Sequence, residues 1–313
     1  EGGLSMETID NRVRDILRVK FLTGLFDTPY QADLALADKE VNSEAHQQVA
    51  LQASREGLVL LKNANNLLPL DKSQIKRIAV CGPNADEASF ALTHYGPVAV
   101  EVTTVLEGIK QQVKEGTKVT YTKGCDLVDT NWPESEIISY PLTAEEKTEI
   151  QKAVDNVKES DVAVVVLGGG IRTCGENKSR TSLDLPGHQQ QLLEAIVATG
   201  KPVVLVLING RPLSINWADK FVPAILEAWY PGSQGGTAIA EALFGDYNPG
   251  GKLTVTFPKT VGQIPFNFPA KPASQVDGGQ TPGMTGNQSR INGPLYPFGY
   301  GLSYNTFEYS NLQ

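Results

Sequence analysis

The polar loop between residues 168 and 186 carries the side chains with the most scope for chemistry. It starts with Gly168-Gly169-Gly170, directly after the apolar run Val162–Leu167, and ends at Pro186. Its charged residues are Arg172, Glu176, Lys178, Arg180 and Asp184. A single carboxyl group on such a loop suits a general acid when its surroundings raise the pKa. From composition alone, a solvated loop with internal salt bridges is the favoured alternative.

The spacing inside this loop argues against nucleotide binding. A dinucleotide fingerprint would need a small residue at position 173, where the chain has Thr173, and a helix start in place of the polar segment that follows. A phosphate-binding loop would need Gly-Lys-Ser or Gly-Lys-Thr, whereas the chain has Gly175-Glu176-Asn177. A carboxylate at that position would repel phosphate.

Serine-hydrolase and metal-site motifs are equally weak. Gly232-Ser233-Gln234-Gly235 lacks the spacing of a nucleophile elbow and is typical of a tight turn. The histidines and cysteines are His46, His94, His188, Cys81, Cys125 and Cys174. They share no metal-ligand or disulfide spacing, so the thiols are expected to be buried or semi-buried and no metal or cofactor is predicted. His188 follows Pro186-Gly187 at a helix start and is expected to be a surface or capping residue.

Strands and helices alternate in the part of the chain that must position the loop. Continuous apolar runs such as Val203–Ile208 are typical of parallel strands covered by helices on both faces. Strands are expected at Ile78–Cys81, Val119–Thr122, Val162–Leu167, Val203–Ile208, Ala224–Trp229 and, at a sheet edge, Leu253–Phe257. Helices are expected near Thr103–Lys114, Ala144–Glu159, Gly187–Ala198 and Thr237–Phe244. The fold class is therefore α/β, with a six-stranded, mostly parallel sheet sandwiched between helices.

Helical periodicity and turn signals describe the two flanks of this sheet. Apolar residues recur at three- and four-residue steps in Thr8–Phe26, and Ser43–Glu56 is a second helix with Ser43 as its N-cap. Leu58–Leu61 is a short extended piece. The tail from residue 260 to 313, rich in Gly, Pro, Asn and aromatic residues, is expected to wrap the domain as a long ordered loop.

Length and charge restrict the classes of partner. The chain has 313 residues, 41% hydrophobic and 20% charged, which is enough to bury a sizeable core. Its 27 Lys and Arg against 35 Asp and Glu give a net charge of −8, so nucleic acid and anionic membrane surfaces are poor partners. The apolar runs are far shorter than the ~20 residues of a membrane-spanning helix. The start Glu1-Gly2-Gly3 suggests a piece of a longer protein.

Several motifs together resemble the glycoside hydrolase family 3 β-glucosidases. They are Asp161–Gly169 (DVAVVVLGG), Gly175-Glu176 with Ser179-Arg180, Thr181–Gly187 (TSLDLPG), Gly200–Leu213 (GKPVVLVLINGRPL), Pro231–Gly236, Phe244–Pro258 (FGDYNPGGKLTVTFP) and Tyr296–Tyr304 (YPFGYGLSY). Ile9–Phe26 with Pro29-Tyr30 resembles the last helix of the family's (β/α)8 barrel, and Asn63 with Leu67–Leu70 resembles the start of its second domain. The resemblance implies a barrel helix at 1–30, a linker with a helix at 31–70 and an α/β sandwich with a wrapping tail at 71–313.

The resemblance also implies half of an active site. In the family, a barrel aspartate in a Ser-Asp-Trp setting is the nucleophile, and a glutamate on a second-domain loop is the acid/base. Glu176, in Gly-Glu-x-x-Ser-Arg, matches the glutamate, whereas Ser160-Asp161 is followed by Val162 and does not match the nucleophile. The chain would then contribute Glu176 to retaining hydrolysis of terminal β-D-glucosyl residues and be inactive alone. Arg180 would orient Glu176 or bind substrate, unless it forms a structural salt bridge. Tyr95 would lie near the aglycone, unless it only packs.

Further implications concern the partners and the location. The family's substrates are β-linked oligosaccharides or glycosides, its second domain works with an N-terminal barrel of the same protein, and its location is periplasmic or secreted. Glucosidase and xylosidase members share these motifs, so the motifs do not separate the two sugars. Two other classes stay open: a carbohydrate-binding module without catalysis, and a structural domain that completes a barrel.

Overall fold

The computed structural model describes residues 3–28, 33–92, 95–96, 100–266, 293–306, 308 and 310–311. Two compact units divide the chain, Glu1–His46 and Gln47–Gln313. The first contains α1 (Met6–Leu22) and α2 (Leu34–Glu40), and α3 (Glu44–Gly57) begins at its end. The predicted first helix is confirmed over most of its length, but α1 ends earlier because Thr23 caps it and Gly24 adopts φ +69°.

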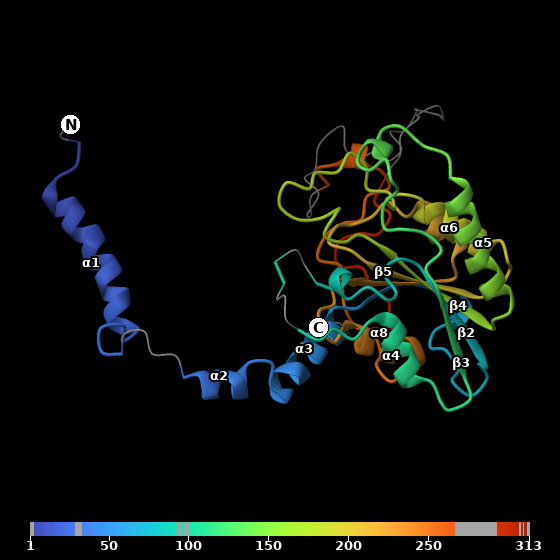
Figure 1. The fold of residues 1–313 in the computed structure, drawn as a ribbon, viewed down its shortest axis with the longest axis horizontal. Coiled ribbons are helices and arrows are strands. Elements are labelled where there is room, and N and C mark those ends of the chain that lie inside the picture. The colour runs from blue at the N-terminus through green and yellow to red at the C-terminus, as the bar shows by residue number, and fades with distance from the viewer. Residues whose placement is uncertain are drawn as a thin grey trace. The chain divides into compact units, whose positions relative to one another are not determined.

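The second unit is built on a six-stranded sheet (Figure 1). Its strands are β1 (Val59–Asn63), β2 (Arg77–Cys81), β3 (Lys118–Thr122), β4 (Val162–Gly168), β5 (Val203–Ile208) and β6 (Ala224–Trp229). The order across the sheet is β1-β6-β5-β4-β2-β3. All neighbours are parallel except β1, which is antiparallel to β6. The predicted six-stranded, mostly parallel sheet is therefore confirmed.

The edge strand beside β6 differs from the predicted one. Leu253–Phe257 forms no strand. It makes an isolated bridge from Phe257 to Tyr296, and Leu253 forms backbone hydrogen bonds with Gly299 and Tyr300 of the tail. The edge is taken by β1, which lies in the stretch 31–70 that was expected to be a linker. Both segments bury apolar side chains, but their backbones have different partners: β1 pairs with β6, whereas Leu253 and Phe257 bond to the tail.

The described part of the tail packs against these two segments, as predicted. Leu302 N–H donates to the carbonyl oxygen of Leu60 on β1 at 2.8 Å. Leu295 N–H donates to the carbonyl oxygen of Phe257, also at 2.8 Å. The tail thus adds a layer of hydrogen bonds outside the antiparallel edge. Residues 267–292, which the same prediction included, lie outside the described residues.

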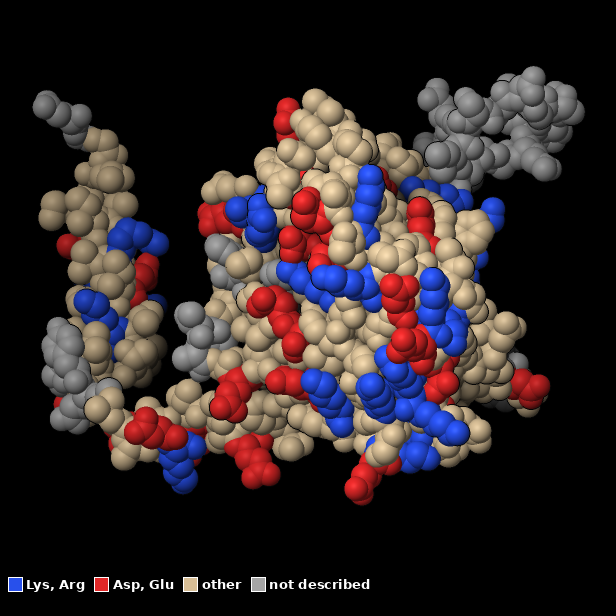
Figure 2. Space-filling view, turned by 45° about the vertical axis from the view of Figure 1, so that its right-hand side comes forward, with Lys and Arg blue, Asp and Glu red and all other residues tan. Residues whose placement is uncertain are grey.

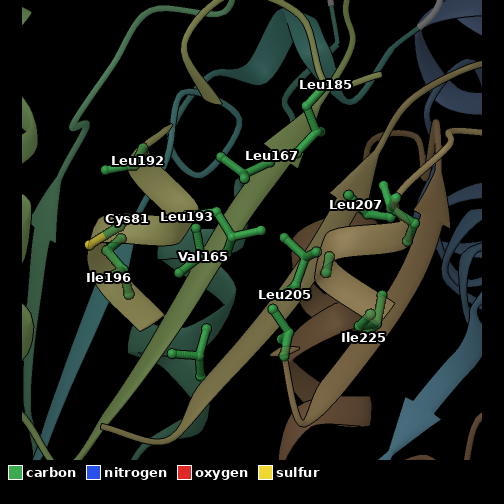
Figure 3. Close-up of a cluster of buried hydrophobic side chains, with 14 of the residues drawn as sticks. Cys81, Val165, Leu167, Leu185, Leu192, Leu193, Ile196, Leu205, Leu207 and Ile225 are labelled. Carbon is green, nitrogen blue, oxygen red and sulfur yellow. The ribbon is translucent and has the colours of Figure 1, made fainter. Parts of the chain in front are cut away.

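Helices cover both faces of the sheet, and each face has its own core. On one face lie α4 (Val105–Gln112) and α8 (Gly235–Phe244), and on the other α5 (Ala144–Lys158) and α6 (Gln189–Val197) (Figure 1). Successive residues of β4 and β5 alternate between the two cores, which is why their sequences are continuously apolar. Figure 3 shows the core under α6, where Val165 and Leu167 meet Leu192, Leu193 and Ile196.

Local signals explain the helix positions. Thr104 and Thr143 form capping boxes with Glu107 and Glu146 at the starts of α4 and α5. α4 and α8 approach closely, since a β-carbon at Gly108 would lie 2.1 Å from the carbonyl oxygen of Gly236. Two short helices, α2 and α7 (Asn216–Phe221), were not predicted.

His188 corrects a prediction. It is not a surface residue, because it is only 7% exposed. It does occupy the N-cap position of α6, the other predicted alternative, but its side chain makes no capping hydrogen bond. Its Nδ1 lies 2.9 Å from Glu146 Oε1, and its Nε2 lies 3.1 Å from the carbonyl oxygen of Tyr140. It therefore joins the start of α6 to the start of α5.

The cysteines agree with the sequence-based expectation. Cys81 and Cys125 are buried and Cys174 is partly exposed, and all three thiols are free. Burial raises the pKa of Cys81 to about 12. Figure 2 shows acidic and basic residues interspersed over the face in view. Among the described residues, no helix is long and apolar enough to cross a bilayer.

Candidate active site at the carboxyl edge of the sheet

The loop that carries Glu176 leaves the sheet at a topological switch point. β2 and β4 are neighbours, but the chain continues from β2 to β3 on one side and from β4 to β5 on the other. Open α/β sheets bind ligands outside the carboxyl ends of strands at such points. The two loops that start here are joined directly, since Asn84 Nδ2 donates to the carbonyl oxygen of Gly169 at 2.8 Å.

The start of the loop is held firmly. Gly168 adopts φ +137°, and a β-carbon there would lie 2.0 Å from the carbonyl oxygen of Ile208, so only glycine fits. The fully buried Gln189 of α6 accepts from Gly168 N–H at 2.8 Å and donates to its carbonyl oxygen at 2.9 Å. Thr173, also buried, closes a turn by accepting from Gly170 N–H at 3.0 Å. These contacts fix the path of the chain before it reaches Glu176.

Glu176 and Tyr95 come together although 81 residues separate them in the sequence. Glu176 is exposed, and its backbone N–H donates to Tyr95 Oη at 3.0 Å. Tyr95 Oη in turn donates to Glu176 Oε2 at 3.4 Å. The tyrosine is 66% exposed, so its ring also faces solvent. Two of the three predicted site residues therefore form one exposed, hydrogen-bonded pair that could exchange a proton and contact a ligand.

Arg180 lies on the same loop but is used differently. Its side chain is 4% exposed, and it forms an ion pair with Glu136, whose side chain is 5% exposed. Glu136 Oε2 also accepts from Thr181 N–H at 3.0 Å. The Arg180 guanidinium lies 5.0 Å from the ring centroid of Trp132 and donates to the carbonyl oxygen of Asp184 at 3.0 Å.

Burial and the nearby charge of Arg211 lower the pKa of Arg180 to about 10, so the guanidinium remains cationic at neutral pH. No hydrogen bond joins Arg180 to Glu176 within the described part of the chain. The geometry thus favours the salt-bridge alternative for Arg180 over a direct contact with substrate.

Three polar residues beside the loop were not singled out from the sequence. Arg211 Nη2 donates to the carbonyl oxygens of Thr173, at 3.3 Å, and Lys178. Asn209 Nδ2 lies 3.1 Å from both carboxyl oxygens of Glu227. Burial raises the pKa of Glu227 to about 8, so this carboxyl group is mostly protonated at neutral pH. A glutamate within the apolar strand AILEAW, and polar residues directly after the strand VVLVLI, are signals that could have indicated this cluster.

Two hollows in the surface lie away from these groups. One of about 340 Å³ is lined by Pro212, Val255, Ile264 and Phe298 among others, and a second of about 340 Å³ lies between α3 and the end of β6. Neither is lined by Glu176, Tyr95 or Arg180. Within the described ranges, no group of three His, Cys, Asp or Glu side chains is arranged to hold a metal ion. The chemistry that this edge supports is that of an exposed carboxylate beside a phenol.

Comparisons with known proteins place the chain in a family. Residues 58–304 match the family model of the glycosyl hydrolase family 3 C-terminal domain. The chain is 42% identical over 313 residues to a β-xylosidase from Formosa agariphila, covering 97% of this chain and 40% of that protein. It is 39% identical over 328 residues to a periplasmic β-glucosidase from Salmonella typhimurium, covering 99% and 42%.

A solved β-glucosidase from Erythrobacter marinus superimposes with a TM-score of 0.81 at 39% identity, covering 94% of this chain and 40% of that one. The chain therefore spans about two fifths of the length of the relatives it matches. The resemblance in the motifs is confirmed, and the chain belongs to glycosyl hydrolase family 3, with the family's C-terminal domain at residues 58–304.

Proposed function

We propose that this chain supplies the acid/base glutamate, Glu176, to the active site of a retaining β-glycosidase. The observation that carries the proposal is the position of Glu176: an exposed carboxyl group at the switch point of the sheet, held from one side by Tyr95. Membership of a glycoside hydrolase family supports the reaction class.

The other half of the site would come from an N-terminal (β/α)8 barrel of the same protein, of which residues 1–30 would be the last helix. A barrel aspartate would attack the anomeric carbon while Glu176 protonates the departing oxygen. Glu176 would then deprotonate the water that releases the sugar, with the two carboxyl groups about 5–5.5 Å apart. Because one carboxyl group cannot form and break the glycosyl-enzyme intermediate, the chain alone would be inactive.

The remaining site residues take roles that follow from their contacts. The exposed ring of Tyr95 beside Glu176 supports a contact with the aglycone. The buried pairing of Arg180 with Glu136 supports a role in shaping the loop.

The substrate class and the location follow from the relatives. For the sugar we propose a terminal β-D-glucosyl residue, with a β-xylosyl residue as the alternative, since relatives of both names match the chain. A periplasmic or secreted location is proposed from the relative named as periplasmic. Turnover of matched aryl glucosides and xylosides by the intact protein distinguishes the two sugars.

Replacing Glu176 by Gln in the intact protein tests the acid/base role. Substrates with poor leaving groups should lose roughly 10²–10⁴-fold in glycosylation rate, because they need the proton most. Substrates with good leaving groups should retain glycosylation and become limited by deglycosylation, which still needs a base. Azide should then restore turnover and yield the β-glycosyl azide, since an anionic nucleophile needs no deprotonation.

The matched control is Glu115→Gln, at an exposed glutamate in a turn outside the site. It should leave every substrate unchanged. If Glu176→Gln stays within about twofold of wild type for all leaving groups, well short of the effect of a general acid/base, the acid must be sought elsewhere.

A further inference from the structure

The loop that carries Glu176 is tied down on both sides of that residue by one side chain. Arg211 Nη2 donates to the carbonyl oxygen of Thr173, three residues before Glu176, at 3.3 Å. The same nitrogen donates to the carbonyl oxygen of Lys178, two residues after it. A guanidinium can bridge two carbonyl groups because it offers several donors in a rigid plane.

The backbone between these two carbonyl groups is irregular. Gly175 adopts φ +136° and Asn177 adopts φ +59°, positive values that glycine and asparagine adopt more readily than other residues. The segment is exposed from Glu176 to Ser179, so little packing stabilises it. We call the segment from Cys174 to Asn177 the crest of the loop. Because the carbonyl groups of Thr173 and Lys178 on either side of it bond to Arg211, the crest presents Glu176 to solvent.

Hydrogen bonds at the ends of β5 and β6 hold Arg211 in place. Its backbone N–H donates to Asn209 Oδ1 at 3.3 Å. Asn209 is 2% exposed, and its Nδ2 lies 3.1 Å from both carboxyl oxygens of the fully buried Glu227. Glu227 Oε1 accepts from Trp229 N–H at 2.8 Å, and Asn209 N–H donates to the carbonyl oxygen of Trp229 at 3.1 Å. The network therefore runs from the sheet interior to the loop crest.

Other contacts of the loop do not replace this one. The ion pair of Arg180 with Glu136 acts after the crest, and Tyr95 contacts Glu176 itself. Among the described residues, Arg211 is the one side chain that bonds the loop on both sides of Glu176 and it has no carboxylate partner there.

We propose that Arg211 is a positioning residue that clamps the Glu176 loop through the carbonyl groups of Thr173 and Lys178, with the Asn209–Glu227 pair as its support. The consequence for catalysis rests on the proposed function, in which Glu176 is the acid/base. The clamp itself does not depend on that function.

The clamp is tested in the 313-residue chain by amide hydrogen exchange on a millisecond-to-second scale. Arg211→Met keeps the length of the side chain and removes its donors. The amides of Cys174, Glu176 and Lys178, which donate inside the loop or to Tyr95, should exchange about tenfold faster or more, since charged hydrogen bonds are lost. Amides of β5 and β6 should be unchanged. Unchanged loop exchange would overturn the proposal.

Two further variants keep the test decisive. Arg172→Met removes an exposed arginine of the same loop that has no hydrogen bond among the described residues. The loop amides of this variant should exchange at the wild-type rate. Arg211→Lys, which can reach one carbonyl group at a time, should give intermediate loop exchange. If Arg211→Met also loses protection in β5 and β6, Arg211→Lys serves as the test variant in its place. Loop exchange equal to wild type in Arg211→Lys would then overturn the clamp.

The catalytic consequence is tested in the intact glycosidase by a double-mutant cycle. Arg211→Met should lower kcat about tenfold for a poor leaving group and less for a good one, and added guanidinium ion should restore part of the loss. In the Glu176→Gln background the same substitution should have almost no effect, because Arg211 acts through Glu176. An equal loss in both backgrounds would overturn the positioning role. Faster loop exchange together with a silent Glu176→Gln would instead refute the proposed function and leave the clamp intact.

Discussion

Glu176 and Glu227 lie at the same carboxyl edge of one sheet, but in opposite surroundings. Glu227 lies in β6, two residues before its end, is fully buried, and accepts hydrogen bonds from Asn209 and from the backbone of Trp229. Glu176 is exposed on a loop beyond β4, and its side chain and its backbone N–H form hydrogen bonds with Tyr95. One carboxyl group is enclosed by its own domain, and the other faces outward.

The contrast shows that a strongly perturbed pKa does not by itself mark a proton donor. Burial raises the pKa of Glu227 to about 8, a value that would suit a general acid. Yet Glu227 has no exposed surface through which a substrate could reach it. Its position under Asn209 indicates a structural acid, whereas the accessible Glu176 can meet a ligand.

The pH dependence of stability gives the strongest test of this difference between Glu227 and Glu176. The pKa of folded Glu227, about 8, lies above the roughly 4.3 of an unfolded glutamate, so the folded state binds this proton more tightly. The stabilising contribution is therefore complete at low pH and is lost as the pH rises through about 8. We expect the free energy of unfolding of wild type, relative to Glu227→Gln, to fall by roughly 3–4 kcal/mol between pH 5 and 8.

Urea unfolding of both proteins at several pH values measures that difference directly. Groups other than Glu227 titrate in both chains, so their contributions cancel in the comparison. A difference that stays constant across the range would mean that Glu227 does not hold a proton in the folded state.

Truncating each glutamate separates structural from accessible carboxyl groups. Glu227→Ala leaves the Trp229 N–H and the Asn209 amide without their acceptor, each costing about 1–3 kcal/mol when buried. We expect a loss of about 2–4 kcal/mol at pH 6, against about 0.5 kcal/mol or less for Glu176→Ala, whose side chain is exposed. Denaturant unfolding gives both values. Equal destabilisation by the two substitutions would contradict the distinction between them.

The smallest expected effect concerns the single hydroxyl group that holds Glu176. Tyr95→Phe removes the acceptor for Glu176 N–H and the donor to Oε2. At about 0.5–1.5 kcal/mol per hydrogen bond, kcat of the intact enzyme on a poor leaving group should fall roughly 2–10-fold, with stability nearly unchanged. Tyr121→Phe, at another partly exposed tyrosine, whose hydroxyl donates to Gly82 at 3.5 Å, is the control. If the two variants have the same kinetics, Tyr95 does not contribute to the site.

Much of the sheet was predictable because its signals are local. The runs Val162–Leu167, Val203–Ile208 and Ala224–Trp229 are apolar on both faces, and they became the three central neighbours β4, β5 and β6. Ser43 was predicted as an N-cap, and in the structure Thr104 and Thr143 act in the same way; each accepts from a backbone N–H three residues away. The family and the loop at residue 168 could also be identified from motifs, since these are contiguous stretches of sequence.

Contacts between distant segments needed the tertiary structure. Local propensity predicted Leu253–Phe257 as an edge strand, but the edge beside β6 is Val59–Asn63, because pairing depends on which backbone groups the fold brings together. The same reasoning applies to His188, whose surface or buried state depends on the packing of α5 against α6.

The sequence by itself determined the α/β class, the family and Glu176 as the candidate acid/base. The tertiary structure decided that Tyr95 meets Glu176 across 81 residues and that Arg180 is paired with Glu136 across 44. It also decided that Arg211 reaches the loop from the end of β5. The physical reason is that side-chain hydrogen bonds depend on atoms within about 3 Å, a proximity that only the folded arrangement of strand ends creates.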